Sequence, residues 1–345
     1  MPPNAAFTHA VWGEHRRGRV LRALLTPLEG VYRAAVAGRN ALFDLGLRQA
    51  RQPALPAVSV GNLSTGGTGK TPFASFLVER LQAMGARPGL VLRGYGGDEV
   101  AVHQFLQPSL AVFANADRVV GSEQAKAKGC DVVVFDDAFQ HRQVHRDLDV
   151  LLVSADAPWT TRCLPCGPLR EPPVGLRRAD LVVVTRKAAS LQAAFTIEGR
   201  LKALGAQAVA HAELVFDGLW VVGQDSAPPL APDALGGKLV LAIAGVGDAE
   251  AFFRQLEQRG ARVQRRAFPD HFAYCADHIT ALLRGAESAD YVVCTLKDAV
   301  KLRALWPRSG PTLWYVSQCV DLGSGGDAVD NLLRRLTRAK SRTNP

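Results

Sequence analysis

The sequence predicts an α/β protein built on a parallel sheet with helices on both faces, followed by a second, smaller α/β domain. Three observations lead to this prediction. Short apolar runs typical of buried strands alternate with helical patterns, a glycine-rich turn follows the first run, and a stretch rich in Pro, Gly, Ala and Asp divides the alternation in two. With 345 residues, 48% of them hydrophobic and 21% charged, the chain is long enough for about two globular domains.

The alternation of elements defines the expected organisation. The first series has strands at 57–60, 89–92, 132–135, 150–153 and 181–185 and a helix at 72–84. The second series has strands at 239–244, 262–266, 291–295 and 312–316 and helices at 248–259 and 277–286. We therefore expect a basic amphipathic N-terminal segment (1–50) and a core domain (51–222). A linker (223–237), a smaller α/β domain (238–330) and a frayed basic tail (331–345) should follow.

The N-terminal segment predicts a helix that begins at a capping box. Thr26-Pro27-Leu28-Glu29 has the capping pattern with proline at the first helical position. Glu29 should lie away from the apolar face, which we expect to be formed by Leu28, Val31, Tyr32, Ala35, Val36, Leu42 and Phe43. This face either packs on the core or lies on a membrane surface, and no apolar run reaches the roughly 18 residues that span a bilayer.

The charge and the cysteines limit the class of protein. The net charge is +9, and eight arginines against three acidic residues in 1–52 suit an anionic surface, either phospholipid or nucleic acid. A nucleic-acid-binding protein is disfavoured because RNP-type aromatic motifs and zinc-finger spacings are missing from the sequence. Six cysteines without a secretory leader indicate a reducing cytoplasm, and Cys163 and Cys166 have the spacing of a redox or zinc pair that no second pair completes.

The glycine-rich turn predicts a phosphate-binding loop of the P-loop NTPase type. A strand leads into Ser64-Thr65-Gly66-Gly67-Thr68-Gly69-Lys70-Thr71, which opens a helix. The glycines allow phosphate to approach the backbone N–H groups, and the helix N-terminus adds the positive end of its dipole. Lys70 would reach the β- and γ-phosphates, and the Thr71 hydroxyl would bind Mg²⁺. Ser64 replaces the first glycine of the usual pattern, at a position that mainly needs a small residue.

A second motif supplies the acidic residue that a nucleotide-bound Mg²⁺ requires. Asp136 and Asp137 follow a run of apolar residues at 132–135. Two adjacent carboxylates after a buried strand are costly unless a cation neutralises them, although such a pair also caps helices. These motifs predict Mg·NTP binding and leave open whether the protein is a kinase, an ATPase or a GTPase.

At this point several segments together resemble one family, the bacterial tetraacyldisaccharide 4′-kinases of lipid A synthesis. The set is specific because the segments occur in the family's order along residues 20–316. They are VGNLSTGGTGKTP (60–72), RGYGGDE (93–99), FDDAFQHR (135–142), LPCGPLREP (164–172), VVVTRK (182–187), AFPDHFAY (267–274) and TLKDAVKL (295–302).

The resemblance implies a reaction and a location. The γ-phosphate of ATP would pass to the 4′-hydroxyl of a tetraacylated glucosamine disaccharide 1-phosphate, giving lipid IVA. The enzyme would be peripheral on the cytoplasmic face of the inner membrane and would need ATP and Mg²⁺. Its partners would be the lipid substrate and the anionic membrane surface, with neither nucleic acid nor an obligate protein partner.

Residue roles follow from the matching motifs. The loop 64–71 would bind ATP, with Lys70 also catalytic. Asp98 would be the general base for the sugar hydroxyl, and His271 would orient it from the other domain, so that domain closure assembles the site. The metal would be held by Thr71, Asp136, Asp137 and Glu171, and substrate or phosphate would also contact Arg93, Gln140, His141 and Arg170.

The chain departs from the family pattern near two of these residues. The family usually has tens of residues between RGYGG and GDE, whereas here Gly97 is followed directly by Asp98. The family's DHH is Asp270-His271-Phe272, and its TEKD is TLKD (295–298). The alternative reading is a P-loop GTPase or ATPase that acts as a switch or metallochaperone. It would require a guanine-reading N-K-x-D, which TLKD resembles only loosely.

Overall fold

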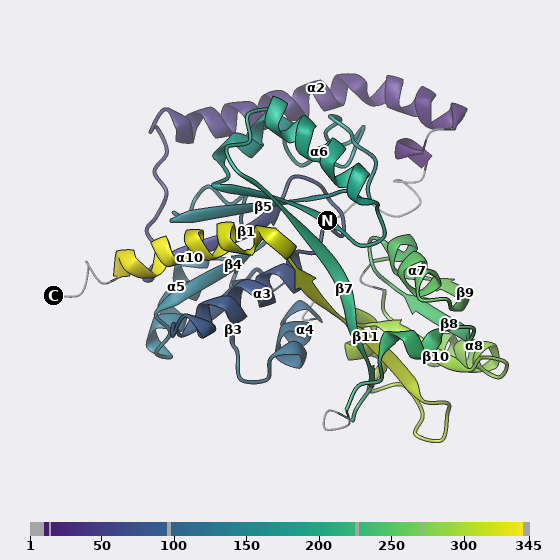
Figure 1. The fold of residues 1–345 in the computed structure, drawn as a ribbon. Coiled ribbons are helices and arrows are strands. Elements are labelled where there is room, and N and C mark those ends of the chain that lie inside the picture. The colour runs from purple at the N-terminus through teal and green to yellow at the C-terminus, as the bar shows by residue number, and fades with distance from the viewer. Residues whose placement is uncertain (1–9, 14, 95–97, 225–227, 271, 341–345) are drawn as a thin grey trace. The chain divides into compact units, whose positions relative to one another are not determined.

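The computed structural model describes residues 10–13, 15–94, 98–224, 228–270 and 272–340. It divides into two compact units (Figure 1). Unit 1 comprises 1–94, 109–212 and 322–345, and unit 2 comprises 95–108 and 213–321. The sheets of both units are mostly parallel and carry helices, which confirms the predicted α/β class.

Unit 1 contains a parallel sheet. Its strands lie in the order β3 (Ala111–Ala114), β2 (Pro88–Leu92), β4 (Val132–Asp136), β1 (Ala57–Asn62), β5 (Leu148–Ser154) and β6 (Leu181–Arg186). Strands β1, β2 and β4 are buried along their whole length. Continuous apolar strands of this kind are typical of a parallel sheet that is covered on both faces.

Helices of unit 1 begin where the sequence provides caps or glycine. α5 (Arg118–Ala127) begins at Asp117, whose carboxylate accepts the N–H groups of Val119 and Val120. α3 (Lys70–Ala83) begins after Gly69, whose φ of 85° is the left-handed conformation that glycine adopts without strain. α3 buries Phe73, Leu77 and Leu81. The remaining elements are α2 (Arg16–Asp44), η1 (Pro173–Arg178), α6 (Leu191–Ala203), η3 (Gly323–Gly325) and α10 (Gly326–Lys340).

Helix α2, the long purple helix of Figure 1, begins earlier than predicted. It begins at Arg16, so Pro27 lies inside the helix and Thr26 donates its hydroxyl to the Arg22 carbonyl instead of capping. Glu29 is 3% exposed and Leu28 is 57% exposed, so Glu29 lies away from the exposed apolar residues, as expected. These exposed residues are Val20, Leu21, Leu24, Leu28, Val31 and Leu42, whereas Tyr32, Val36 and Phe43 of the expected apolar face are half-buried.

The strands of unit 2 follow the order β7 (Val209–Val221, which begins in unit 1), β11 (Leu313–Asp321), β10 (Tyr291–Thr295), β8 (Leu239–Ala244) and β9 (Arg262–Ala267). β7 pairs antiparallel with β11, and the other pairs are parallel. Its helices are α4 (Asp98–Leu106), η2 (Pro232–Leu235), α7 (Ala249–Gln258), α8 (Ala276–Ala286) and α9 (Leu296–Leu302).

The units do not follow the expected linear order of domains. Residues 95–108, which include α4, group with unit 2, although they were expected in the core domain. The C-terminal residues 322–345 group with unit 1. Instead of a frayed tail at 331–340, α10 buries Val329, Leu332, Leu333 and Leu336, and Arg80 binds Asp330 through two hydrogen bonds of 3.0 and 2.9 Å. Among the described residues, no helix combines the length and hydropathy needed to cross a membrane.

Candidate functional site

The candidate site lies at the carboxyl ends of neighbouring strands in unit 1. β1 ends at Asn62 and leads into the glycine loop, and β4 ends at Asp136. The two strands are paired in parallel with Val60 opposite Asp136, so the first carboxylate of the predicted metal pair lies beside the start of the loop. Crevices at this edge of an open α/β sheet are the usual location of ligands.

Polar side chains from neighbouring strands hold the glycine loop in place. Asn62 donates its amide to the Gly66 carbonyl and the Thr68 hydroxyl at 3.2 and 2.9 Å. Thr185 donates its hydroxyl to the Thr68 carbonyl at 3.0 Å, and the Lys187 ammonium donates to the Gly67 carbonyl at 2.9 Å. Gly66 and Gly67 remain exposed, as a loop that receives phosphate on its backbone requires.

The first part of the loop is also paired with the segment around residues 168–170. Ser64 forms an antiparallel bridge with Leu169, and the N–H of Thr65 donates to the Pro168 carbonyl at 2.8 Å. Asp137 is the one non-glycine residue with positive φ in the described part of the chain, so Ser64 has an ordinary backbone conformation. The serine in place of the usual glycine is therefore accommodated without backbone strain.

Asp137 is surrounded by cations. Arg170 donates from one nitrogen to both Asp137 oxygens at 2.8 and 2.9 Å, and the Lys70 ammonium lies 3.7 Å from the same carboxylate. Burial by itself would raise the pKa of the Asp137 carboxyl, but Lys70 and Arg170 outweigh it and hold that pKa below its ordinary value. These three predicted residues therefore meet at one place.

Asp136 and Thr71 offer hard oxygen donors next to the loop. Asp136 is 6% exposed at the end of β4, and Thr71 lies in the first turn of α3. At the base of the loop, Asn62 Oδ1 and Thr65 Oγ1 are buried and have no hydrogen-bond partner among the described residues. Carboxylate and hydroxyl oxygens are the ligands that Mg²⁺ takes beside phosphates, so the donor set fits that ion.

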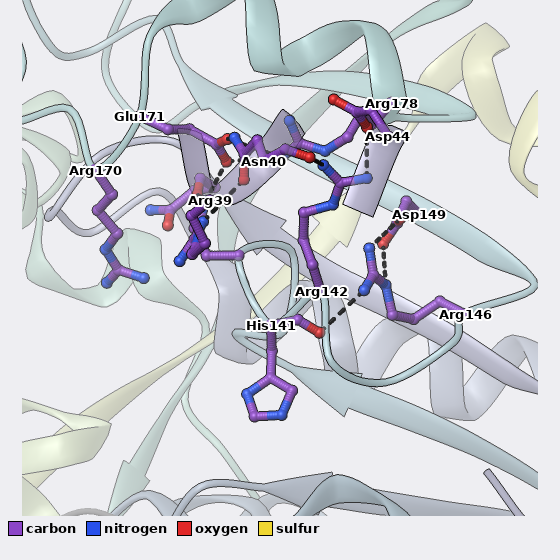
Figure 2. A network of polar contacts seen from close by, with 12 residues as sticks. Arg39, Asn40, Asp44, His141, Arg142, Arg146, Asp149, Arg170, Glu171 and Arg178 are labelled. Carbon is purple, nitrogen blue, oxygen red and sulfur yellow. Dashed lines mark hydrogen bonds and ion pairs between the residues drawn. The ribbon is translucent and has the colours of Figure 1, made fainter. Parts of the chain in front are cut away.

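The carboxylate of Glu171 is held in a network of hydrogen bonds. It is fully buried, and Arg178 donates to both of its oxygens at 2.9 and 2.8 Å. Asn40 and Gln140 donate to the same carboxylate at 3.2 and 3.0 Å. Figure 2 shows Asn40 of α2 beside this carboxylate. Because four hydrogen bonds occupy its oxygens, Glu171 belongs to a structural network that supports the site.

The other predicted contact residues occupy different positions. Gln140 links Glu171 to the Asn62 carbonyl at 2.8 Å. His141 lies next to it, and its ring points away from the Glu171 cluster (Figure 2). Burial, and then the nearby Arg118 and Arg146, lower the pKa of His141, which keeps the imidazole neutral at neutral pH. Arg93 follows β2 and is exposed.

The two residues predicted to act on the acceptor are in the sequence of unit 2. Asp98 is the first residue of α4, and its side chain is outside the described part of the structure. His271 also lies outside the described residues. The described segments next to these two residues, 98–108 and 272–321, group with unit 2.

The loosely guanine-like TLKD segment has a structural role. Asp298 is fully buried and accepts the Gly245 N–H at 2.9 Å and the hydroxyls of Tyr274 and Thr295 at 2.8 and 2.6 Å. Burial raises the pKa of Asp298 and of the Tyr274 phenol. A carboxylate enclosed in this way cannot reach a nucleotide base.

Some supporting residues were missed by the sequence analysis. Asn62 and Lys187 lie inside the quoted motifs 60–72 and 182–187, so their proximity to the glycine loop could have been inferred from strand order. Tyr32 and Arg118 gave no local signal. Tyr32 donates its hydroxyl to the Arg170 carbonyl at 2.7 Å, and buried Arg118 donates to the Asp136 carbonyl at 3.1 Å.

Comparison with known proteins identifies relatives of this chain. The family model described as tetraacyldisaccharide-1-P 4′-kinase matches residues 21–110 and 97–337. A tetraacyldisaccharide 4′-kinase of Anaeromyxobacter dehalogenans is 36% identical, with 94% of each chain covered. One from Geobacter metallireducens is 34% identical over 85% of this chain and 92% of its own length. The crystal structure of LpxK from Aquifex aeolicus in complex with ATP superposes with a TM-score of 0.71 at 28% identity, covering 92% of this chain and 99% of that one.

Proposed function

Because this chain belongs to the tetraacyldisaccharide-1-P 4′-kinase family, we propose that it transfers the γ-phosphate of ATP to the 4′-hydroxyl of a tetraacylated glucosamine disaccharide 1-phosphate. The product would be the 4′-phosphorylated lipid of lipid A biosynthesis. The observation that carries this proposal is the pairing of Val60 with Asp136, which brings the glycine loop and an acidic strand end together at one edge of the sheet. This is the arrangement that P-loop enzymes use for a metal-bound nucleotide.

The glycine loop and the start of α3 would hold the phosphates of ATP. The exposed backbone at Gly66 and Gly67 and the N-terminus of α3 favour negative charge. Lys70, now 3.7 Å from Asp137, and Arg170 are the cations that would contact phosphate oxygens. Both contact Asp137 in this structure, so Asp137 holds them at the site and offsets one of their two charges.

Mg²⁺ would be held by Thr71 and Asp136, with Asp137 as the second carboxylate. When bound, the ion would neutralise charge that develops on the phosphate oxygens during transfer. Asp136 lies at the end of a strand that is buried throughout, which fixes its position before a ligand arrives. Glu171 is left out of this set because its side chain is fully buried against Arg178, whereas the Asp137 side chain is 38% exposed.

Asp98 is the proposed general base for the sugar hydroxyl, and His271 is proposed to orient it. A carboxylate at the start of a short helix can accept the proton of an attacking hydroxyl, and phosphoryl transfer demands positioning more than strong basicity. The grouping of both segments in unit 2 supports this proposal, since one compact unit can carry both residues.

The protein is further proposed to act as a peripheral enzyme at the cytoplasmic face of the inner membrane. The exposed apolar residues of α2 and the arginines at its start are the features that an interfacial helix uses on an anionic bilayer. An acyl-chain-bearing acceptor and the enzyme would then meet at the same surface.

The decisive experiment is a lipid-kinase assay. Purified protein is mixed with γ-labelled ATP, Mg²⁺ and the acylated disaccharide 1-phosphate, and the lipid is separated and analysed by mass spectrometry. We expect one added phosphate on the 4′ position. Lys70→Ala is the matched control and should form no product. Equal ATP consumption with and without lipid, and no phosphorylated lipid, would reject the kinase in favour of an NTPase.

A further inference from the structure

The inner face of α2 carries polar side chains with defined partners. Glu29, Tyr32 and Asn40 form hydrogen bonds within unit 1, beside half-buried Val36 and Phe43. Ordinary amphipathic helices are held by apolar contacts, which tolerate small shifts along the helix axis. Buried polar groups need partners in defined directions, so hydrogen bonds fix the position of α2 on unit 1 closely.

The first connection runs from Tyr32 to the start of the glycine loop. The Tyr32 hydroxyl donates to the Arg170 carbonyl at 2.7 Å. The N–H of Arg170 donates to the Leu63 carbonyl at 2.7 Å, so the segment held by Tyr32 is the one paired with the loop. The Arg170 side chain binds Asp137, and hence lies next to Lys70. Tyr32 is thus two hydrogen bonds away from the backbone that opens the loop.

The second connection runs from Asn40 to the middle of the same loop. The Asn40 amide donates to Glu171 at 3.2 Å, and Glu171 accepts from Gln140 at 3.0 Å. Gln140 also donates to the Asn62 carbonyl, and the Asn62 amide holds Gly66. The two connections start eight residues apart on α2, about two helical turns, and reach different parts of the loop.

We propose that Tyr32 and Asn40 are positioning residues for the phosphate site, through which α2 sets the shape of the glycine loop. A loop that binds phosphate by its backbone depends on the direction of each N–H group, so a small displacement weakens several contacts together. The inference rests on the proposed function in taking nucleotide as the ligand of this loop. The inference goes beyond the proposed function because it assigns a role in nucleotide binding to α2, the helix that carries the exposed apolar residues.

The test compares three substitutions of nearly unchanged size in the full-length protein. Tyr32→Phe removes only the hydroxyl, and Asn40→Leu removes only the amide. Asp44→Asn is the control, because Asp44 on the same helix accepts a hydrogen bond of 2.7 Å from the Arg142 side chain and belongs to neither connection. Isothermal titration with Mg·ADP measures the affinity of each variant, and thermal unfolding checks that all remain folded at the titration temperature.

We expect Tyr32→Phe and Asn40→Leu each to raise the Kd for Mg·ADP about two- to tenfold, the factor that one hydrogen bond contributes. Asp44→Asn should stay within about twofold of wild type. The inference is overturned if neither variant weakens ADP binding, or if Asp44→Asn weakens it equally. The titration needs no lipid, so a wild-type chain that binds ADP without phosphorylating lipid would refute the proposed function and still let these three variants decide the inference.

Discussion

Replacing Glu171 by glutamine separates the two roles that this residue could have. As a metal ligand, its loss would weaken Mg²⁺ binding and leave the fold intact. As the centre of a buried network, its loss would leave the Arg178 guanidinium, whose side chain is 21% exposed, without its counter-charge. The structure supports the second role, because Arg178 bridges both carboxylate oxygens at 2.9 and 2.8 Å and Glu171 is fully buried.

The size of the effect follows from this geometry. Breaking a buried ion pair by removing one partner costs about 3–5 kcal/mol. For a unit of about 200 residues, each kcal/mol shifts Tm by about 2–4 °C, so we expect Glu171→Gln to lower Tm by about 10 °C. Arg178 also stacks on Phe139, with its guanidinium carbon 4.7 Å from the ring centre, so Arg178→Met keeps apolar contact there. The double variant should therefore recover part of the lost stability.

Two measurements read out the result. Circular dichroism gives Tm for the wild type, Glu171→Gln and the double variant, and initial rates against Mg²⁺ concentration give the half-saturating concentration of the metal. We expect the loss of Tm with a half-saturating concentration close to wild type. A Tm within about 2 °C of wild type, combined with a tenfold higher Mg²⁺ requirement, would refute the reasoning and restore Glu171 as a metal ligand.

Three further predictions concern other parts of the chain. Asp98→Ala should lower kcat by at least about 10²-fold with little change in ATP affinity, and near-normal turnover would reject it as the base. Glu29 has a lowered pKa, because hydrogen bonds from the Cys163 N–H and Arg162 outweigh its burial. The ionised Glu29 carboxylate therefore stabilises the fold fully above the pKa that it has in the unfolded chain, and this stabilisation is lost as the pH falls through its pKa in the folded protein. The difference in Tm between wild type and Glu29→Gln should be full at pH 7 and shrink below about pH 4.5. A difference that stays constant with pH would contradict this assignment. Leu24→Asp with Leu28→Asp should release the protein from anionic vesicles in a flotation assay and leave Mg·ADP affinity unchanged, whereas unchanged vesicle binding would place the membrane contact elsewhere.

Sequence reasoning succeeded where local chemistry determines the structure. The predicted strand at 132–135 and the aspartates that follow it match β4, which ends at Asp136, and the predicted glycine loop opens α3 after Gly69. Apolar runs, glycine and a following carboxylate act over a few residues, so their pattern can be read directly. The departure at Ser64 could also be judged locally, since its backbone does not require glycine.

It was limited where a residue's contacts lie far along the chain. The resemblance implied that Glu171 binds metal, but it gave no sign that Arg178, Asn40 and Gln140 all donate hydrogen bonds to this carboxylate. Asn40 lies 131 residues before Glu171 in the sequence, and no local pattern indicates that the two side chains are in contact. The grouping of residues 95–108 with unit 2 has the same cause, since chain order does not determine which core a short helix joins.

Helix α2 shows what a hydrophobic pattern leaves open. Its hydrophobic stripe is real, but periodicity cannot say whether an apolar face points toward the core or toward a surface. Two residues decide the matter: Glu29 faces inward because it meets Arg162 and the Cys163 N–H at 2.9 and 2.8 Å, and Tyr32 faces inward because its hydroxyl meets Arg170. Once these polar contacts fix the inner face, the apolar residues must lie outside. The same hydrogen bonds that leave this face available to a lipid surface also hold the segment that supports the phosphate loop.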